Sequence, residues 1–437
     1  MEWYWLFSLA IGSLVALMLL GMPVVFAFML VNVIGAYTLM GGLAGIEQLV
    51  INTVESISSF TLVPIALFMI MGEAMFHSRI AFDLMDALDK WMGKIRGRLA
   101  FMAVGGGVLF STLTGNSMGS TALLGSTLVP EMEARGYKAP MSIGPILGSA
   151  GLAIMIPPSS LAVILGVVAE ISIGRLLMGI IVPGLLMALL YAVYIYLRCL
   201  LDPDVAPTFD VPEVPLVEKL DATVRHILPL SLVVFSVVGF IFLGIATPSE
   251  AAASGAIATL LLVWLKRRMT WKVLKDTLFD SANIAAMVLV IVAGAVTFTQ
   301  LLAYTGATEG MVEFIIGLQA SSGALVLLMI VSVIILGMFM GPLPIMLVTL
   351  PIYVPVVISF GYDPIWFAVM YLIAIETGAT SPPLGGALFV MKAVAPIGTT
   401  MSDIYKAATP FILCDLLAIG LVFSFPIIVL GPVEYMW

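Results

Sequence analysis

Charged side chains are scarce in this chain of 437 residues: aspartate, glutamate, lysine and arginine together make up 10% of it, against 62% hydrophobic residues. A water-soluble domain cannot bury so large an apolar fraction. The apolar runs have the length of a helix that crosses a bilayer, and they lack the short alternating segments of an outer-membrane barrel. The composition therefore predicts an all-α integral membrane protein in a lipid bilayer.

The residue types that build disulfides, metal sites and catalytic sites are also few. Cys199 and Cys414 are the only cysteines, which argues against a disulfide framework or a thiolate metal site. His77 and His226 are the only histidines, and both lie at the ends of apolar runs, where an interfacial role is expected rather than a catalytic one. A net charge of −8 gives no reason to expect a nucleic-acid partner. We predict no enzyme and no cofactor.

The chain contains an internal repeat. Four prolines of the first half recur 225 positions later: Pro23, Pro130, Pro157 and Pro158 match Pro248, Pro355, Pro382 and Pro383. The pattern Val-Pro-x5-Gly-Tyr at 129–137 recurs at 354–362. Internal repeats in an apolar chain are typical of secondary transporters, whose substrate sites lie where the two repeats meet.

The lengths of the apolar runs, and the glycine, proline and polar residues between them, predict about five crossings in each half. They are 4–20, 23–40, 59–77, 139–168 and 175–198, then 227–245, 249–265, 280–302, 364–395 and 408–430. We divide the chain into a first repeat at 1–200, a cytoplasmic linker at 201–224 and a second repeat at 225–437. Because five is an odd number, the second repeat must enter the membrane from the opposite side, so the repeats are inverted in topology.

The basic residues indicate the orientation of these crossings. No basic residue precedes the first apolar run, so we expect that run to stay as a span rather than to be removed as a signal peptide. With the N-terminus outside, every lysine and arginine except Arg175 falls on the cytoplasmic side. The positive-inside rule then places both termini in the periplasm.

Two apolar segments do not fit as crossings. Residues 100–134 and 322–360 each contain two apolar runs around a tip, at 115–117 and 341–344. We expect re-entrant helical hairpins that enter from opposite faces, since irregular backbone at that depth must be buried or line a wet cavity. Residues 43–58 and 268–279 are too short or too polar to span, and are expected to be interfacial arm helices or, alternatively, ordinary loop helices.

A proline pair interrupts the crossing that follows each hairpin. Pro157-Pro158 breaks the span at 139–168 and Pro382-Pro383 breaks the span at 364–395, because proline lacks an amide hydrogen and clashes with the preceding turn. Unwound carbonyls can coordinate a cation, while the N-terminal ends of the half-helices can hold an anion.

Hydroxyl and amide side chains gather at the tips and breaks, where hard oxygen ligands suit sodium. The predicted sodium and substrate region consists of Gly115, Asn116, Ser117, Ser120, Thr121, Pro157, Pro158, Ser159, Gly341, Pro342, Pro344, Glu376, Thr377, Gly378, Thr380, Ser381, Pro382 and Pro383. The alternative is that these small residues serve helix packing. Neither 139–174 nor 276–391 contains a basic residue. An acidic substrate must therefore be held largely by helix N-termini, hydroxyls and bound cations, unless a basic residue of the first hairpin region or of another subunit reaches it.

Four carboxylates lie in or beside apolar spans, where they are costly and tend to be functional or paired: Glu73, Glu250, Glu376 and Asp415. Glu376 stands at the start of the second break. Glu376 could couple cation binding to transport, or it could accept a hydrogen bond from the unwound backbone. The sequence leaves both roles open.

Five motifs resemble those of the large membrane subunit, the DctM-type M subunit, of tripartite ATP-independent periplasmic (TRAP) transporters, over essentially the whole chain. They are G-N-S-M-G-S-T-A at 115–122, V-P-E-M-E-A-R-G-Y at 129–137, I-P-P-S at 156–159, L-P-I-Y-V-P at 350–355 and E-T-G-A-T-S-P-P-L-G-G-A-L-F at 376–389. At the second tip the chain has Met340-Gly341-Pro342 where many relatives have an acidic residue.

The resemblance implies sodium-driven import of an organic acid across the bacterial inner membrane. The acid, a dicarboxylate, 2-oxo acid, sugar acid or similar anion, is delivered by a periplasmic binding protein, the P subunit. The resemblance further implies a small four-helix membrane subunit, the Q subunit, as a separate chain. It also implies an elevator mechanism like that of the ion-transporter superfamily, in which hairpins and broken helices move against a fixed scaffold.

Other functions stay open at this point. A self-sufficient sodium/carboxylate transporter of similar hairpin architecture, which needs no binding protein, is the main alternative. A channel would not need two opposed hairpins together with two broken helices. A membrane enzyme would need a metal cluster or a nucleophile with its base, and two poorly placed histidines argue against one.

Overall fold

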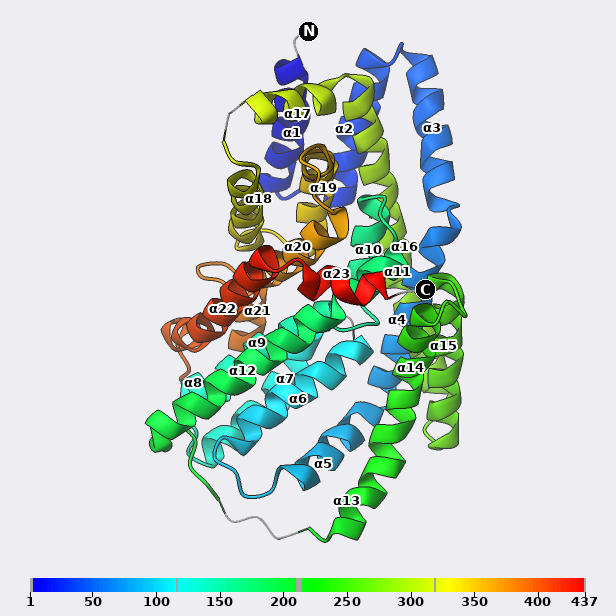
Figure 1. Cartoon of the computed structure of the whole chain (residues 1–437). Helices are drawn as coiled ribbons and strands as arrows, with labels where there is room; N and C mark the ends of the chain where they lie inside the picture. Colours follow the sequence, from blue (N-terminus) through cyan, green and yellow to red (C-terminus); the bar gives the residue numbers. More distant parts are fainter. Residues whose placement is uncertain (1–2, 115–116, 210–213, 318–319, 436–437) are drawn as a thin grey trace.

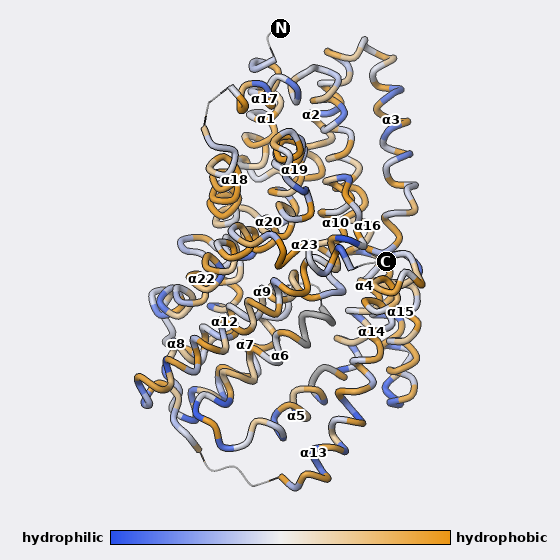
Figure 2. Tube along the Cα trace, viewed as in Figure 1, coloured by the Kyte–Doolittle hydropathy of each residue, from blue (hydrophilic) through white to orange (hydrophobic). Residues whose placement is uncertain are grey.

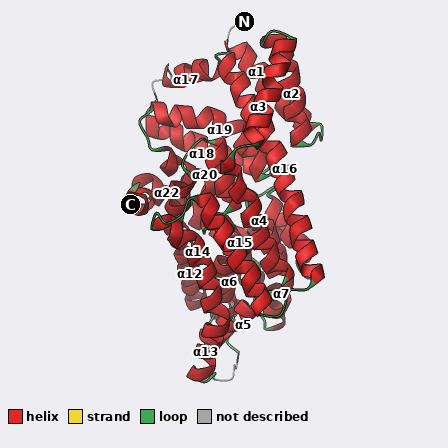
Figure 3. Cartoon of the chain, turned by 90° about the vertical axis from the view of Figure 1, so that its right-hand side faces the viewer, coloured by secondary structure: helices red, strands yellow, loops and turns green. Residues whose placement is uncertain are grey.

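The computed structural model describes residues 3–114, 117–209, 214–317 and 320–435, of which 19, 81–82 and 109–114 are described by their backbone alone. In this part the chain consists of helices joined by loops (Figure 3). In that part, seven helices are long and apolar enough to cross a membrane, and a bent pair adds an eighth span. Hydrophobic residues, drawn in orange, predominate along the helices in Figure 2, and hydrophilic residues are more frequent at the turns. The all-α membrane class is therefore confirmed.

The helices of the first half follow the predicted crossings (Figure 1). They are α1 (Trp3–Leu19), α2 (Val24–Leu39), α3 (Leu43–Ile57), α4 (Val63–His77), α5 (Ile80–Met92), α6 (Arg98–Thr114), α7 (Ser117–Ala134), α8 (Ala139–Ser142), α9 (Gly144–Met155), α10 (Ser160–Val168), α11 (Ile173–Gly179) and α12 (Ile181–Leu201). The first hairpin is thus the pair α6 and α7, and the first broken span is α8 and α9 followed by α10, bent by 49° at the break.

The second half of the chain is also helical. Its helices are α13 (Leu216–Ala222), α14 (Leu228–Phe242), α15 (Pro248–Leu265), α16 (Trp271–Tyr304), α17 (Ala307–Gly317), α18 (Ser322–Gly337), α19 (Pro342–Ser359), α20 (Pro364–Ala379), α21 (Gly386–Val394), α22 (Met401–Ser424) and α23 (Ile427–Glu434). The second hairpin is α18 and α19, and α20 and α21 are the two parts of the second broken span.

Three boundaries differ from the sequence prediction. The expected arm helix at 268–279 is not separate, because α16 runs as one helix of 34 residues from Trp271 to Tyr304. The linker expected at 201–224 becomes helical from Leu216 and continues through a π-helical turn into α14. The last predicted crossing, 408–430, covers the end of α22 and the start of α23, since Phe425 and Pro426 interrupt the helix.

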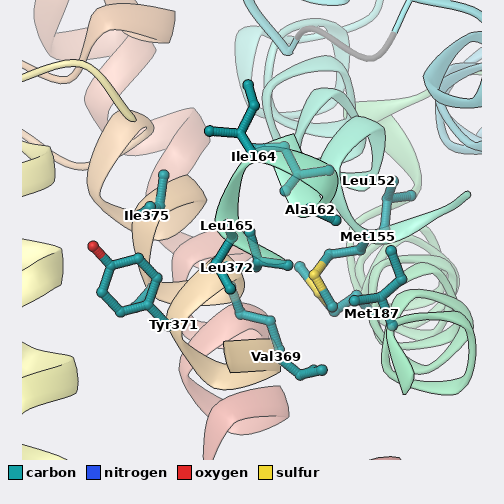
Figure 4. Packing of buried hydrophobic residues seen from close by; sticks show 14 of the residues in the cluster. Leu152, Met155, Ala162, Ile164, Leu165, Met187, Val369, Tyr371, Leu372 and Ile375 are labelled. Atoms are coloured by element: carbon teal, nitrogen blue, oxygen red, sulfur yellow. The ribbon is translucent and has the colours of Figure 1, made fainter. Parts of the chain in front are cut away.

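Helices of the two halves pack on each other around the breaks. Hairpin helix α6 packs on α9 and α18 packs on α20, each within its own half. Across the halves, α7 packs on α21 and α10 packs on α19. The apolar core between them includes Leu165 of α10 and Leu372 of α20, which Figure 4 shows beside Met155 and Met187. The breaks of both halves are therefore joined by one continuous apolar core.

The linker between the halves is fastened to the base of the first hairpin. The Phe209 ring lies over the Arg135 guanidinium, with 3.9 Å between the guanidinium carbon and the ring centroid. The Lys138 amide donates to the Val205 carbonyl at 3.0 Å. Farther along, the Trp91 indole of α5 donates to the Thr223 hydroxyl at 2.9 Å. These contacts hold the described parts of the linker, 201–209 and 214–224, against the first half of the chain.

Candidate functional site

Both broken spans open at their proline pairs. Helix α9 ends at Met155 and α10 begins at Ser160, while α20 ends at Ala379 and α21 begins at Gly386. The Pro157-Pro158 and Pro382-Pro383 peptide bonds are both cis. A proline supplies no amide hydrogen, so neither pair can continue the helical ladder and the carbonyls of the preceding turn are left for other partners.

The two half-helices that follow the breaks begin differently. The Ser159 hydroxyl is fully buried and caps α10 by accepting from the Ala162 amide at 3.2 Å. Helix α21 has no side-chain cap and starts after Gly385. A Cβ at Gly385 would lie 2.7 Å from the Ser381 carbonyl oxygen, so only glycine lets the chain turn back this closely. The free amides at the start of α21 can meet an anion.

The hydroxyls at the second break are buried and point back into their own helix. Thr377 donates to the Ile373 carbonyl at 2.7 Å, Thr380 to the Glu376 carbonyl at 3.1 Å and Ser381 to the Thr377 carbonyl at 2.6 Å. Each of these side chains is at most 4% exposed. A hydroxyl that donates its hydrogen still offers its oxygen lone pairs. The second break therefore presents oxygen acceptors, which is what a cation needs.

Glu376 is the buried carboxylate of the site. It is 1% exposed, and neither carboxylate oxygen has a hydrogen-bond partner of normal geometry among the described residues. The Ser117 hydroxyl, at the start of α7, faces it. Gly151 of α9 lies directly against its Cγ, because a Cβ there would overlap that atom. One side chain of the second half thus touches a hairpin and a broken span of the first half.

A second buried carboxylate lies close by. Asp415 of α22 is 2% exposed, and its Oδ1 accepts from the hydroxyl of Tyr191 on α12, which is fully buried. Asp415 lies near enough to Glu376 to be affected by its charge. The two carboxylates differ in that Asp415 accepts a hydrogen bond from Tyr191, whereas Glu376 has no hydrogen bond of normal geometry among the described residues.

The first tip meets the second break. Gly115 and Asn116 lie outside the described residues. Ser117, Ser120 and Thr121 are buried on α7, and Thr121 donates to the Ser117 carbonyl at 2.9 Å. A Cβ at Gly386 would lie 2.7 Å from Cε of Met118, so α21 starts against the start of α7. Of the predicted residues of the first tip, the structure thus places the described ones, on α7, beside the second break.

The second tip lies next to the second break, through the end of α18. Gly337 at the end of α18 and Gly378 of α20 are in backbone contact. Gly341 caps α19 and is exposed, and Pro342 and Pro344 in its first turn are partly buried. The tip has no carboxylate, in keeping with its sequence. The exposed tip lies at the edge of the buried group rather than inside it.

Sequence reasoning missed some partners and misjudged one carboxylate. Tyr191, Gly151 and Gly337 were not predicted, because nothing in the sequence pairs them with Asp415, Glu376 and Gly378. Glu250 is exposed and forms a capping box with Thr247 at the start of α15, accepting from the Thr247 amide at 2.8 Å. Its place at the end of a span therefore reflects helix capping.

The chain matches a family model over residues 11–428. The model is described as "Tripartite ATP-independent periplasmic transporter, DctM component". This match covers far more than half of the chain. It includes all the motifs at the tips and breaks.

Curated relatives cover the chain almost from end to end. The "C4-dicarboxylate TRAP transporter large permease protein DctM" of Pseudomonas aeruginosa is 30% identical over 391 residues, which are 88% of this chain and 89% of that protein. The "Ectoine TRAP transporter large permease protein TeaC" of Halomonas elongata is 27% identical over 97% of this chain and 98% of its own. The "Isethionate TRAP transporter permease protein DctMQ" of Oleidesulfovibrio alaskensis is 30% identical over 82% of this chain and 55% of its own length.

The fold has a solved counterpart. The YdaH transporter of Alcanivorax borkumensis superposes with a TM-score of 0.64 at 15% sequence identity, covering 88% of this chain and 89% of that one. At this identity the likeness concerns the fold, which is that of a membrane transporter.

Proposed function

Because the chain belongs to the DctM component family of the tripartite ATP-independent periplasmic transporters, we propose that it is the large permease subunit of a sodium-driven transporter that imports an organic acid. The observation that carries this proposal is the buried group at the second break. There the carboxylate of Glu376, which has no hydrogen bond of normal geometry among the described residues, and several hydroxyl oxygens lie beside the first hairpin. A carboxylate buried within the membrane is costly and tends to be functional.

In this proposal sodium binds at the tips and breaks. The oxygens of Ser117, Thr377 and Thr380, the carbonyls left by the proline pairs and the carboxylate of Glu376 supply hard ligands. Sodium at Glu376 would neutralise that charge and strengthen the positive potential that the free amides of α21 offer to an acid. Cation binding and anion binding would then support each other without a basic residue in 276–391.

The movement proposed is that of an elevator with two inverted repeats. Hairpin helices and half-helices of both halves interlock around one core, since α7 packs on α21 and α10 on α19. A group packed in this way is suited to move as one body, while α2, α4, α15 and α16, which pack on one another, are suited to stay fixed. The charge placement in the sequence favours periplasmic termini in the inner membrane.

The proposed partners are a periplasmic binding protein and a small four-helix membrane subunit. The relatives named above are permeases for C4-dicarboxylate, ectoine and isethionate, so the substrate is proposed to be a small organic anion or zwitterion that the binding protein selects. A joined permease named DctMQ among them supports a neighbouring Q-type subunit. The alternative is a carrier that works alone.

Reconstitution tests the proposal. The periplasmic binding protein is first identified by co-purification with the permease and is then screened by thermal shift against dicarboxylates, 2-oxo acids, sugar acids, polyols, ectoine and isethionate. The permease is then placed in liposomes with its small subunit, and uptake of the labelled hit is measured with and without a sodium gradient. We expect uptake only when binding protein and inward sodium gradient are both present. Uptake by the permease alone would establish the self-sufficient carrier, and uptake with equal sodium on both sides and no gradient would refute sodium coupling.

A further inference from the structure

A second polar cluster lies between α4 and α16, away from the proline breaks. The Nε2 atom of His77 is 2.9 Å from Oδ2 of Asp280 and 3.4 Å from Oε2 of Glu73. One ligating atom from each of the three side chains lies within 4.8 Å of the other two. All three side chains are partly buried, with exposed fractions of 21% for His77, 23% for Glu73 and 45% for Asp280.

The two helices create this arrangement by their periodicity. Glu73 and His77 are four residues apart, so they share one face of α4, and that face packs on α16. On α16, Thr277 lies one turn before Asp280 and shares its helical face, and Ser281 lies one turn after Thr277. The hydroxyls of Thr277 and Ser281 are buried and have no hydrogen-bond partner among the described residues. The contact between two otherwise apolar helices is therefore unusually rich in oxygen and nitrogen acceptors.

The cluster borders a cavity through His77. The cavity has a volume of about 930 Å³, and its lining includes His77, Asp276 and the basic residues Arg79, Arg268 and Lys272. The Arg268 guanidinium pairs with the Asp83 carboxylate at 2.8 Å and donates to the Ser78 and Arg79 carbonyls. Among the described residues, His77 is the nitrogen-bearing side chain within ion-pair distance of both carboxylates of the cluster, and a divalent cation would neutralise both.

We propose that Glu73, His77 and Asp280 form a zinc site that joins α4 to α16. Zinc accepts imidazole nitrogen and carboxylate oxygen at about 2.0–2.2 Å, and tetrahedral ligands then lie roughly 3.4 Å apart, close to the separations seen around His77. Calcium and magnesium prefer oxygen ligands alone, so the histidine selects against them. Three protein ligands leave a fourth position for water on the side of the cavity. The site is separate from the proposed transport path and does not depend on the proposed function.

The test uses zinc itself on the full-length chain in detergent, with any polyhistidine tag removed. The protein is stripped with a chelator, loaded with zinc, passed over a desalting column and analysed by mass spectrometry for metal per chain. The variants are His77→Ala and Asp280→Asn. His226→Ala is the matched control, because His226 is the other histidine and its ring nitrogen has a single carboxylate, Asp83, at 3.6 Å.

We expect one zinc per chain in the unmodified protein and in His226→Ala, and none in His77→Ala or Asp280→Asn. Zinc at 100 times its dissociation constant should raise the melting temperature of the first two by about 3 °C and leave the other two unchanged. If a variant fails to fold, the unmodified protein is loaded with cobalt(II) in place of zinc and its visible absorption spectrum is measured. A tetrahedral site of nitrogen and oxygen ligands gives an intense visible band. No stoichiometric zinc and no such band, or zinc retained by His77→Ala, would overturn the site and leave His77 as a simple hydrogen-bonded bridge between two carboxylates.

Discussion

Gly337 and Gly378 lie in backbone contact where α18 crosses α20. A Cβ on Gly378 would be 2.7 Å from the Cα of Gly337 and 2.7 Å from the Ile334 carbonyl oxygen. Small residues allow such approach between membrane helices, where dispersion and packing rather than water exclusion hold helices together. This contact fixes the second hairpin against the second break, so the tip at Gly341 and the hydroxyls around Thr380 keep a set distance.

Replacement of Gly378 by alanine should force α18 away from α20. We expect a loss of stability of about 2 kcal/mol, typical of an overpacked core, and a loss of transport larger than the loss of folded protein. Thermal unfolding in detergent and uptake per folded molecule measure the two effects. Gly420→Ala on α22 is the control, because a Cβ there meets nothing within 4 Å. Equal behaviour of the two alanine variants would contradict the close crossing.

Replacement of Tyr191 by phenylalanine removes the hydroxyl that donates to buried Asp415. We expect destabilisation of about 1–3 kcal/mol, since a buried acceptor loses its partner. The double variant Tyr191→Phe with Asp415→Leu should recover part of that loss. Tyr196→Phe on the same helix is the control, because Tyr196 is 60% exposed. The pairing is structurally unimportant if Tyr191→Phe and Tyr196→Phe unfold at the same temperature.

Loss of single oxygen ligands at the second break should weaken sodium binding. For Ser117→Ala, Glu376→Gln and Thr380→Ala we expect the sodium concentration at half-maximal uptake to rise about tenfold, equivalent to roughly 1.4 kcal/mol of binding energy. The measurement is uptake against sodium concentration in proteoliposomes. Thr409→Ala is the control, since Thr409 makes the same kind of bond to the Tyr405 carbonyl, at 2.8 Å, on an exposed face. Unchanged sodium dependence in all three would disprove the assignment.

Single cysteines should report the orientation of the two halves. In a background without Cys199 and Cys414, we expect Glu309→Cys to react with a membrane-impermeant maleimide in spheroplasts and Ile397→Cys to react only after lysis. Both side chains are exposed, Ile397 fully so, which makes access a question of membrane side alone. Labelling of Ile397→Cys in intact spheroplasts would reverse the topology inferred from the basic residues.

Much of the fold could be predicted because its signals are local. Each proline pair lies between two helices, α9 and α10 for Pro157-Pro158 and α20 and α21 for Pro382-Pro383, and the helices at the first pair are bent by 49°. Helices also lie on either side of each predicted tip, and the re-entry of these helix pairs into the membrane stays a prediction. The predicted arm at 268–279 was wrong as a separate element, because the polar residues of that segment do not stop a helix and α16 continues through them.

The sequence by itself determined the membrane class, the helices, the breaks and the residue types available there, since composition, apolar length and proline chemistry act over a few neighbouring residues. Only the tertiary structure decided that Glu376 meets Gly151 and Ser117, that Asp415 takes the Tyr191 hydroxyl, and that Asp280 joins Glu73 and His77. These residues are about 200 or more positions apart, apart from the pair on α4. Their meeting depends on how apolar helix faces pack, and no local pattern specifies which face finds which partner.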